Sequence, residues 1–261
     1  MAKFCTLYSG STGNSTYIGT SQGGILIDVG ISGRGLCDQL CRVGVSIDTI
    51  KAIFVTHEHG DHISGVRIVA SKYNIPVYAT AGTLEGMTEA GKLNDKCEAF
   101  PLDGPVEAAA MTVQPFATSH DSRQSCGYLV RTPDLRTIAV CTDLGCMTDE
   151  VRGALAGADL VMLESNHDLG MLQNGPYPYH LKRRVMGDRG HLSNAVCAEQ
   201  LPGLLQGGTT RFVLAHLSRE NNFPALAIAT ARGTLELAGA VQGQDYLLEA
   251  AAPAVPLTVM L

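Results

Sequence analysis

The chain has 261 residues, of which 45% are hydrophobic and 29 are glycine, and its formal net charge is −6. This length allows one α/β domain with a large core, and the acidic charge excludes a protein that grips long duplex DNA through bulk electrostatics. The sequence shows neither a secretory signal nor an apolar run long enough to span a membrane, so we expect a cytoplasmic protein. Its eight cysteines include no C-x-x-C pair, and we expect them to be reduced thiols.

Periodic apolar segments between turn residues predict the elements in chain order. Strands are expected near residues 3–8, 14–19, 24–28, 52–55, 76–79, 98–101, 109–116, 126–131, 136–141, 159–163, 211–215 and 245–249. Helices are expected at 33–43, 64–73, 81–91, 148–156, 177–187, 192–205 and 224–238. This order gives two β-rich halves that each end in helices, within a single domain of residues 1–261. From about residue 250 the chain is expected to form a loose connection to a short terminal strand or tail.

The first polar segment is a glycine and hydroxyl loop from Ser9 to Ser15, between two expected strands. Such a loop can point backbone N–H groups and hydroxyls at an anion. The ordinary alternative is a hairpin turn, because turns also use small polar residues. The candidate substrate contacts in this loop are Ser9, Ser11, Thr12 and Asn14.

The densest set of metal-ligand residues follows the expected strand at 52–55. The run His57-Glu58-His59-Gly60-Asp61-His62 places three imidazoles and a carboxylate within six residues of the strand end. His57 and His59 leave a strand on one side because side chains repeat every two residues, and the turn at Gly60 directs the next residues differently. We interpret the run as two adjacent cation sites, with Asp61 and His62 at the second. A solvated polar loop with accidental histidines is the ordinary alternative.

This H-x-H-x-D-H pattern resembles the metallo-β-lactamase superfamily, and later residues match that superfamily's remaining ligands in order. His120, Asp143 and His216 each follow an apolar, strand-like run. The resemblance assigns His120 to the first metal, Asp143 to a bridging position and His216 to the second metal. A single residue of this kind is more often a turn or capping residue, but three in the family's order favour ligands. Asp28, at the end of an earlier strand, matches an aspartate that supports the metal loop.

Two further segments resemble nuclease branches of the superfamily. Gly190-His191-Leu192-Ser193 is similar to an element of β-CASP enzymes and ribonuclease Z in which the histidine acts on the leaving group, whereas a polar helix cap is the local alternative. Glu164, at a strand end, matches a glutamate that orients this histidine. Together with the Ser9–Ser15 loop, these segments resemble the bacterial YycJ/WalJ group along nearly the whole chain. Members of that group are regarded as 5′-to-3′ DNA exonucleases.

The resemblance implies a fold, a cofactor and a mechanism. The fold is an α/β metallo-β-lactamase αββα sandwich with metals at one open edge. The cofactor is two divalent metal ions, zinc or manganese with iron also open, because the ligand set lacks cysteine. Two cations outweigh the charges of Asp61, Asp143 and a bridging hydroxide, which suits a phosphodiester anion. The expected catalytic residues are Asp61, His191 as the acid that protonates the leaving oxygen, and Glu164 as its support.

The resemblance implies a nucleic-acid partner. Because basic residues are few, we expect the chain to contact it locally, at DNA ends, and we expect no membrane and no obligate protein partner. The densest basic cluster is Lys182-Arg183-Arg184, for which a solvated helix face is the ordinary alternative. The remaining candidate substrate contacts are His167, Arg184 and Arg189.

Other classes remain open at this point. The chain has no insertion of β-CASP size between Asp143 and His216 and no evident arm like that of ribonuclease Z. A hydrolase of a small ester, thioester or lactone would need His191 only for structure, and a noncatalytic regulator would not need a complete ligand set. The sequence therefore favours a dinuclear-metal phosphodiesterase.

Overall fold

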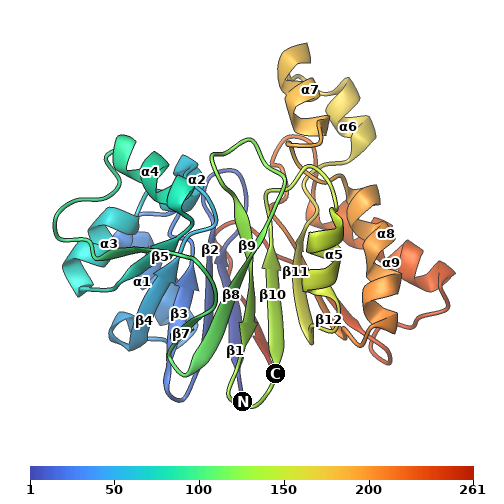
Figure 1. Cartoon of the computed structure of the whole chain (residues 1–261). Helices are drawn as coiled ribbons and strands as arrows, with labels where there is room; N and C mark the ends of the chain where they lie inside the picture. Colours follow the sequence, from blue (N-terminus) through green and yellow to red (C-terminus); the bar gives the residue numbers. More distant parts are fainter. The chain divides into compact units, whose positions relative to one another are not determined.

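A computed structural model describes residues 1–261 (Figure 1). The strands are β1 (Lys3–Tyr8), β2 (Ser15–Thr20), β3 (Gly23–Ile27), β4 (Ile50–Phe54), β5 (Val77–Ala79), β6 (Ala99–Pro101), β7 (Val106–Ala108), β8 (Met111–Ala117), β9 (Cys126–Arg131), β10 (Thr137–Cys141), β11 (Leu160–Glu164), β12 (Arg211–Ala215), β13 (Leu247–Ala250) and β14 (Leu257–Met260). The helices are α1 (Gly33–Arg42), α2 (Gly60–Ile63), α3 (Val66–Tyr73), α4 (Ala81–Glu89), α5 (Asp149–Leu155), α6 (Leu169–Asn174), α7 (Tyr179–Met186), α8 (Asn194–Gln206) and α9 (Pro224–Leu237), with a short 3₁₀ turn, η1 (Ile47–Thr49).

The chain divides into two compact units. Unit 1 consists of Met1–Pro115, Ser122–Arg136 and Ala252–Leu261, and unit 2 consists of Phe116–Asp121 and Thr137–Ala251. The strands form two seven-stranded sheets, ordered β14-β1-β2-β3-β4-β5-β6 and β13-β12-β11-β10-β9-β8-β7. The single-domain organisation stays a prediction.

In unit 1 the first sheet changes from antiparallel to parallel along the chain. β1, β2 and β3 pair as antiparallel neighbours, and the turn into β3 uses Gly23 at a φ of 119°, a conformation that favours glycine. From β3 to β6 the neighbouring strands are parallel, as expected where helices connect successive strands. The carboxyl ends of β3 and β4 therefore share one edge, which places Asp28 and the segment from Thr56 to His62 together.

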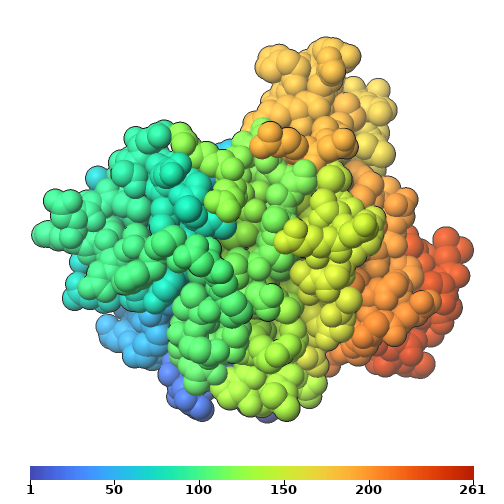
Figure 2. Space-filling view, in the orientation of Figure 1, coloured from blue at the N-terminus to red at the C-terminus, as the bar shows by residue number.

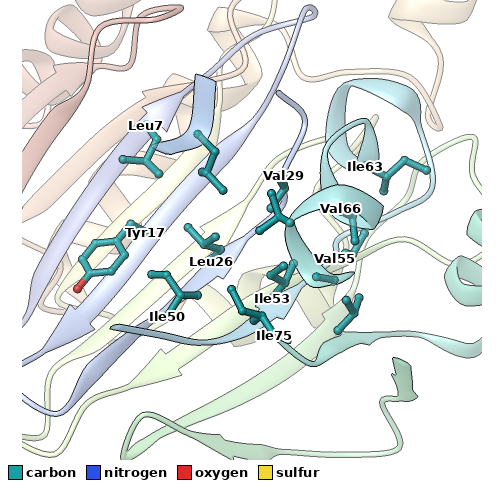
Figure 3. Packing of buried hydrophobic residues seen from close by; sticks show 14 of the residues in the cluster. Leu7, Tyr17, Leu26, Val29, Ile50, Ile53, Val55, Ile63, Val66 and Ile75 are labelled. Carbon is teal, nitrogen blue, oxygen red and sulfur yellow. The ribbon is translucent and has the colours of Figure 1, made fainter. Parts of the chain in front are cut away.

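The core of unit 1 joins the strands to the helices that follow them (Figure 3). Leu26 of β3 and Ile53 of β4 are fully buried in one cluster with Val66 and Val69 of α3. Burial of each such aliphatic side chain contributes about 1.5–3 kcal/mol. Because β4 and α3 are both anchored in this cluster, the histidine segment between them is fixed at both ends.

Unit 2 contains the parallel strands β10, β11, β12 and β13. Every residue of β11 is buried, as expected for a central strand covered on both faces. Leu201 of α8 and Leu235 of α9 are fully buried among the other core residues of the unit. Parallel pairing again gathers the strand ends at one edge, where Asp143, Glu164 and His216 lie.

The structure departs from the expected elements at several places. The strand predicted at 109–116 is β8, which begins at Met111, but its hairpin partner β7 was not predicted. Ala109 and Ala110 form the turn between the two strands, with left-handed φ values of 51° and 57°. A tight hairpin turn of this type normally carries asparagine and glycine, so the alanine pair gave no turn signal. The short helices α2 and α6 were also not predicted. The terminal segment ends in β14, which pairs antiparallel with β1, so the open choice between a strand and a tail is decided in favour of the strand.

The helices lack the combination of length and hydrophobicity that a membrane-spanning helix needs. All eight cysteines have free thiols, and Cys5, Cys126, Cys141 and Cys197 are buried. Burial raises the pKa of the thiols of Cys126 and Cys197 to about 12, which makes both groups poor nucleophiles.

Candidate metal centre

The histidine segment of unit 1 leaves β4 and enters α2. His57 and His62 are buried, whereas His59 and Asp61 are partly exposed. The ring centroids of His57 and His59 are 4.6 Å apart, and those of His57 and His62 are 4.1 Å apart. The structure therefore brings the predicted histidines of this segment together.

Asp28 organises this segment from the end of β3. One carboxylate oxygen accepts a hydrogen bond from the Thr56 backbone N–H at 2.8 Å, and the other accepts from the Thr56 hydroxyl at 2.9 Å. The second oxygen also lies 2.8 Å from Nδ1 of His62. Asp28 itself has a left-handed φ of 61°, which is uncommon outside glycine and indicates a position fixed by its surroundings.

These contacts fix the orientation of the His62 ring. Its Nδ1 lies against the Asp28 carboxylate, and its Nε2 is 3.0 Å from the Asn14 side-chain amide and 3.5 Å from the Asp61 carboxylate. A histidine held by a carboxylate through one ring nitrogen, with the other nitrogen toward further polar groups, is the arrangement that metal-binding histidines use.

The Ser9–Ser15 loop supports the same segment. The Asn14 backbone N–H donates to the carbonyl of Asp61 at 2.8 Å, and the Gly30 N–H donates to the carbonyl of Asn14 at 2.8 Å. A Cβ at Gly30 would lie 1.6 Å from the Asp61 carbonyl oxygen, so only glycine fits there. Of the candidate substrate contacts in the loop, Ser9 and Asn14 are buried and Ser11 and Thr12 are exposed.

Unit 2 gathers a second group of ligand-type residues at the ends of β10, β11 and β12. The ligand atoms of Asp143, Glu164, His191 and His216 all lie within 4.8 Å of one another. Asp143 and His216 both have left-handed φ values, 58° and 55°, directly beyond their strands. Asp28 in unit 1 has the same strained, left-handed backbone conformation.

Asp143 lies between two histidines. Its Oδ1 is 3.8 Å from Nε2 of His120 and 3.5 Å from Nε2 of His216. His120 is fixed from behind, because its Nδ1 lies 3.0 Å from the Gly190 carbonyl. Burial lowers the pKa of His120, which keeps the ring in the neutral form that binds metals.

Glu164 is the organising carboxylate of unit 2. It is fully buried, and its Oε1 lies 2.8 Å from Nδ1 of His191 and 3.0 Å from Nδ1 of His216. Its Oε2 accepts hydrogen bonds from the backbone N–H groups of Leu144 and Leu192, each at 3.1 Å. Glu164 therefore orients both histidines, whereas the sequence predicted support for His191 alone.

The charges of Glu164 and His191 stabilise each other. Burial acts to raise the pKa of Glu164, but the charge of His191 and the donated hydrogen bonds outweigh it and lower the pKa to about 2. Burial acts to lower the pKa of His191, but the Glu164 carboxylate outweighs burial and raises it. His191 thus holds a proton more tightly than an ordinary histidine.

The two predicted substrate arginines lie beside the His120 loop. The Arg189 guanidinium donates from Nε and Nη2 to the His120 carbonyl at 3.1 and 3.0 Å. Arg184 forms a two-contact ion pair with Asp121, with Nη2 donating at 3.1 Å. Arg189 thus holds the backbone of His120 and Arg184 holds the residue after it, and the contact of both arginines with substrate stays a prediction.

A buried amide network behind His191 and His216 was not predicted. The Asn166 side chain donates to the His216 carbonyl at 2.8 Å. Asn222 donates to the Ser165 carbonyl and to the Asn194 side chain, each at 2.8 Å. Asparagines at strand ends and helix starts ordinarily indicate turns and caps, so the sequence carried no signal for this network.

His167, another candidate substrate contact, is almost completely buried. Only 1% of its surface is exposed, and its Nδ1 has no hydrogen-bond partner. Burial lowers the pKa of His167 to about 4, so the ring is neutral at physiological pH. A side chain this buried does not meet a macromolecular substrate without movement of its neighbours.

The donor sets fit divalent cations. Unit 1 contains His57, His59, Asp61 and His62, and unit 2 contains His120, Asp143 and His216. Imidazole nitrogens and carboxylate oxygens without thiolates suit zinc, manganese or iron. The orientation of His62 by Asp28 and of His216 by Glu164 is the support that such ligands require.

The chain is similar to known proteins along most of its length. Residues 24–217 match the family described as the β-lactamase superfamily domain. The chain is 34% identical over 258 residues to exodeoxyribonuclease YycJ of Bacillus anthracis, which covers 98% of this chain and 97% of that relative. It is 34% identical over 262 residues to exodeoxyribonuclease WalJ of Streptococcus pneumoniae, with the same coverage.

A solved structure supports the fold. The metallo-β-lactamase fold protein YhfI from Bacillus subtilis superposes with a TM-score of 0.69 at 16% identity and covers 99% of each chain. At this identity the likeness shows the fold alone. Together with the family match, it confirms the predicted α/β metallo-β-lactamase αββα fold class and the predicted resemblance to the YycJ/WalJ group.

Proposed function

The chain belongs to the β-lactamase superfamily, and from this we propose that it is a metal-dependent exonuclease that degrades DNA. The relatives that match along nearly the whole chain are named exodeoxyribonucleases, which supports a hydrolase acting on phosphodiesters. The alternative of a small ester, thioester or lactone hydrolase is not favoured by these relatives. The expected setting is the cytoplasm, with DNA ends as substrate and no obligate protein partner.

The proposed centre holds two divalent metal ions, zinc or manganese with iron as a third option. His57, His59 and His120 would bind one ion, Asp61, His62 and His216 would bind the other, and Asp143 would bridge them. The approach of His120 and His216 to the same Asp143 oxygen supports this assignment. When bound, the cations would supply an activated water and neutralise charge on the phosphate.

Side chains around the centre are proposed to donate a proton and to position the attacking water. His191, whose ring Glu164 fixes and whose pKa Glu164 raises, is the proposed acid for the departing sugar oxygen. General acid catalysis of this kind contributes about 10²–10⁴ in rate. Asp61 is proposed to hold its metal and to share in positioning the attacking water.

Recognition of a terminal phosphate is assigned to the Ser9–Ser15 loop. Ser11 and Thr12 present exposed hydroxyls, whereas the buried Asn14 is engaged with Asp61 and His62. Neutral donors of this kind suit one terminal phosphate rather than a long run of phosphates. We therefore expect degradation from a 5′-phosphorylated end with 5′-to-3′ polarity.

The test is an assay of the purified holoprotein with Mn²⁺ or Zn²⁺. Linear 5′-phosphorylated DNA, linear 5′-hydroxyl DNA, closed circular DNA, RNA and a generic thioester are compared. We expect fastest loss of the 5′-phosphorylated DNA and no cleavage of circles. Equal cleavage of all three DNAs would indicate an endonuclease, and thioester hydrolysis without DNA cleavage would favour the small-molecule class.

A further inference from the structure

Helix α7 carries an exposed face of unusual composition. Tyr179, Lys182, Arg183 and Met186 recur at i, i+3, i+4 and i+7, the spacing that places side chains on one face of a helix. In most helices of globular proteins this spacing marks the apolar face that packs on the core. Here Tyr179 is 75% exposed and Met186 is 39% exposed, so the face is directed to solvent.

The opposite face of α7 is occupied by contacts within unit 2. Val185 is buried, and Arg184 is committed to Asp121, the residue after His120. The segment that follows α7 leads directly to Gly190 and His191. Space-filling and ribbon views show α6 and α7, in yellow and orange, projecting from the rest of unit 2 (Figure 2).

The exposed face is cationic in an acidic chain. Residues 169–187 contain no aspartate or glutamate, although the chain has 25 such residues. Arg183 and Lys182 form no ion pair, and the Lys182 ammonium donates to the carbonyl of Gln173 at the end of α6. The Arg183 guanidinium carbon lies 6.0 Å from the centre of the Tyr179 ring, at the outer limit of a cation–π contact.

These observations point to one type of occupant. An exposed aromatic ring next to unpaired cations is how proteins hold single-stranded nucleic acid, since bases stack on the ring and the cations follow the phosphates. A long duplex offers no unstacked bases to such a ring. We infer that the Tyr179–Met186 face of α7 binds single-stranded DNA a few nucleotides away from the bond that is cut.

This inference rests on the proposed function for its substrate, and the helix geometry gives its reach. Tyr179 is five residues from Arg184, which corresponds to about 7.5 Å along the helix axis. Arg184 is in turn paired with the neighbour of His120. A strand on this face therefore contacts α7 only if it extends beyond the reacting end, and a dinucleotide is too short to gain from it.

The experiment compares Tyr179→Ala and Arg183→Ala with two controls. Tyr179→Phe keeps the ring, and Arg232→Ala removes a matched exposed arginine from α9, where it pairs only with Glu236. Binding of a 5′-phosphorylated, phosphorothioate single-stranded 12-nucleotide DNA to the holoprotein is measured by fluorescence anisotropy. Cleavage of the natural 12-nucleotide DNA and of a 5′-phosphorylated dinucleotide gives kcat and KM.

We expect Tyr179→Ala to weaken binding of the 12-nucleotide DNA by about 5- to 150-fold, the loss of one base stack. KM for that DNA should rise while kcat and dinucleotide cleavage stay unchanged. Arg183→Ala should reduce the slope of log affinity against log salt by about 0.7. Tyr179→Phe and Arg232→Ala should behave as the unmodified protein.

Three results would overturn the inference. They are unchanged binding by Tyr179→Ala, an equal loss in Arg232→Ala, and an equal loss on the dinucleotide, which would mean damage to the centre itself. Binding of anionic phosphatidylserine vesicles in place of single-stranded DNA would assign the face to a membrane surface instead. Failure of the unmodified protein to cleave any DNA would count against the proposed function, while the anisotropy comparison would still test α7 independently.

Discussion

In each unit a buried carboxylate orients the ligand-type histidines, but the carboxylate is Asp28 in unit 1 and Glu164 in unit 2. In unit 1, Asp28 holds His62 and the Thr56 hydroxyl, which is 3.0 Å from Nδ1 of His57. In unit 2, Glu164 contacts His191 and His216 directly through one oxygen. The histidines of unit 1 lie within six residues of each other, whereas those of unit 2 come from separate loops. Neighbouring ligands can be fixed partly by their own loop, but separated ones depend on a shared acceptor.

The largest expected effects are on turnover and metal content, and they distinguish a proton donor, His191, from a metal ligand, His62. His191→Ala should lower turnover by about 10²–10⁴ while metal content is retained. His62→Ala should lose metal, because that ring is fixed to present Nε2. Metal analysis and single-turnover cleavage of 5′-phosphorylated DNA measure both. Loss of metal from His191→Ala would remove the proposed distinction between the two histidines.

The next comparison replaces the two organising carboxylates by amides. Asp28→Asn and Glu164→Gln should each weaken metal affinity by about 10–100-fold, the usual cost of losing a partner behind the ligands. Glu164→Gln should also lower kcat, since His191 loses the charge that raises its pKa. Competition with a metal chelator gives the affinities. A kcat for Asp28→Asn as low as that of Glu164→Gln, at saturating metal, would contradict the division of roles.

Alanine substitutions at two glycines, one in each unit, test how closely the backbone packs beside the ligand-type residues. A Cβ at Gly30 would lie 1.6 Å from the Asp61 carbonyl oxygen, and one at Gly190 would lie 2.2 Å from the carbonyl oxygen of Arg184. Each alanine variant should lower the free energy of unfolding by about 1–3 kcal/mol through overpacking. Chemical denaturation measures this loss. Gly104→Ala provides a matched control, because nothing lies within 4 Å of its Cβ position and its φ is outside the left-handed region.

The smallest expected effect is the change in the free energy of unfolding on substitution of Arg184 in unit 2. Arg184→Ala removes an ion pair in which both side chains are partly exposed, so its effect on the free energy of unfolding should stay within about 1 kcal/mol. If Arg184 serves only to brace the His120 loop, the KM for single-stranded DNA should change less than in Arg183→Ala. A larger KM change in Arg184→Ala would return this residue to the predicted substrate contacts.

The difference between the units also explains what the sequence could predict. The run from His57 to His62 is visible without a fold because its ligands are adjacent, and most strands and helices follow from apolar periodicity. The link from Glu164 to His216 depends on parallel pairing of β11 with β12, which no local pattern encodes. The same holds for Asn166 behind His216, and for the alanine turn between β7 and β8, where tertiary pairing overrides local turn preference.

Three residues at strand ends, Asp28, Asp143 and His216, adopt backbone conformations that glycine would occupy more readily. A non-glycine residue in a sparsely populated conformation costs about 1–3 kcal/mol. At Asp143, a glycine would relieve that cost and also remove a buried charge, so the resulting chain could be more stable while losing its bridging ligand. Screens that select only for thermal resistance would therefore tend to erase this position, and a heat-tolerant variant should be sought with Asp143 held constant.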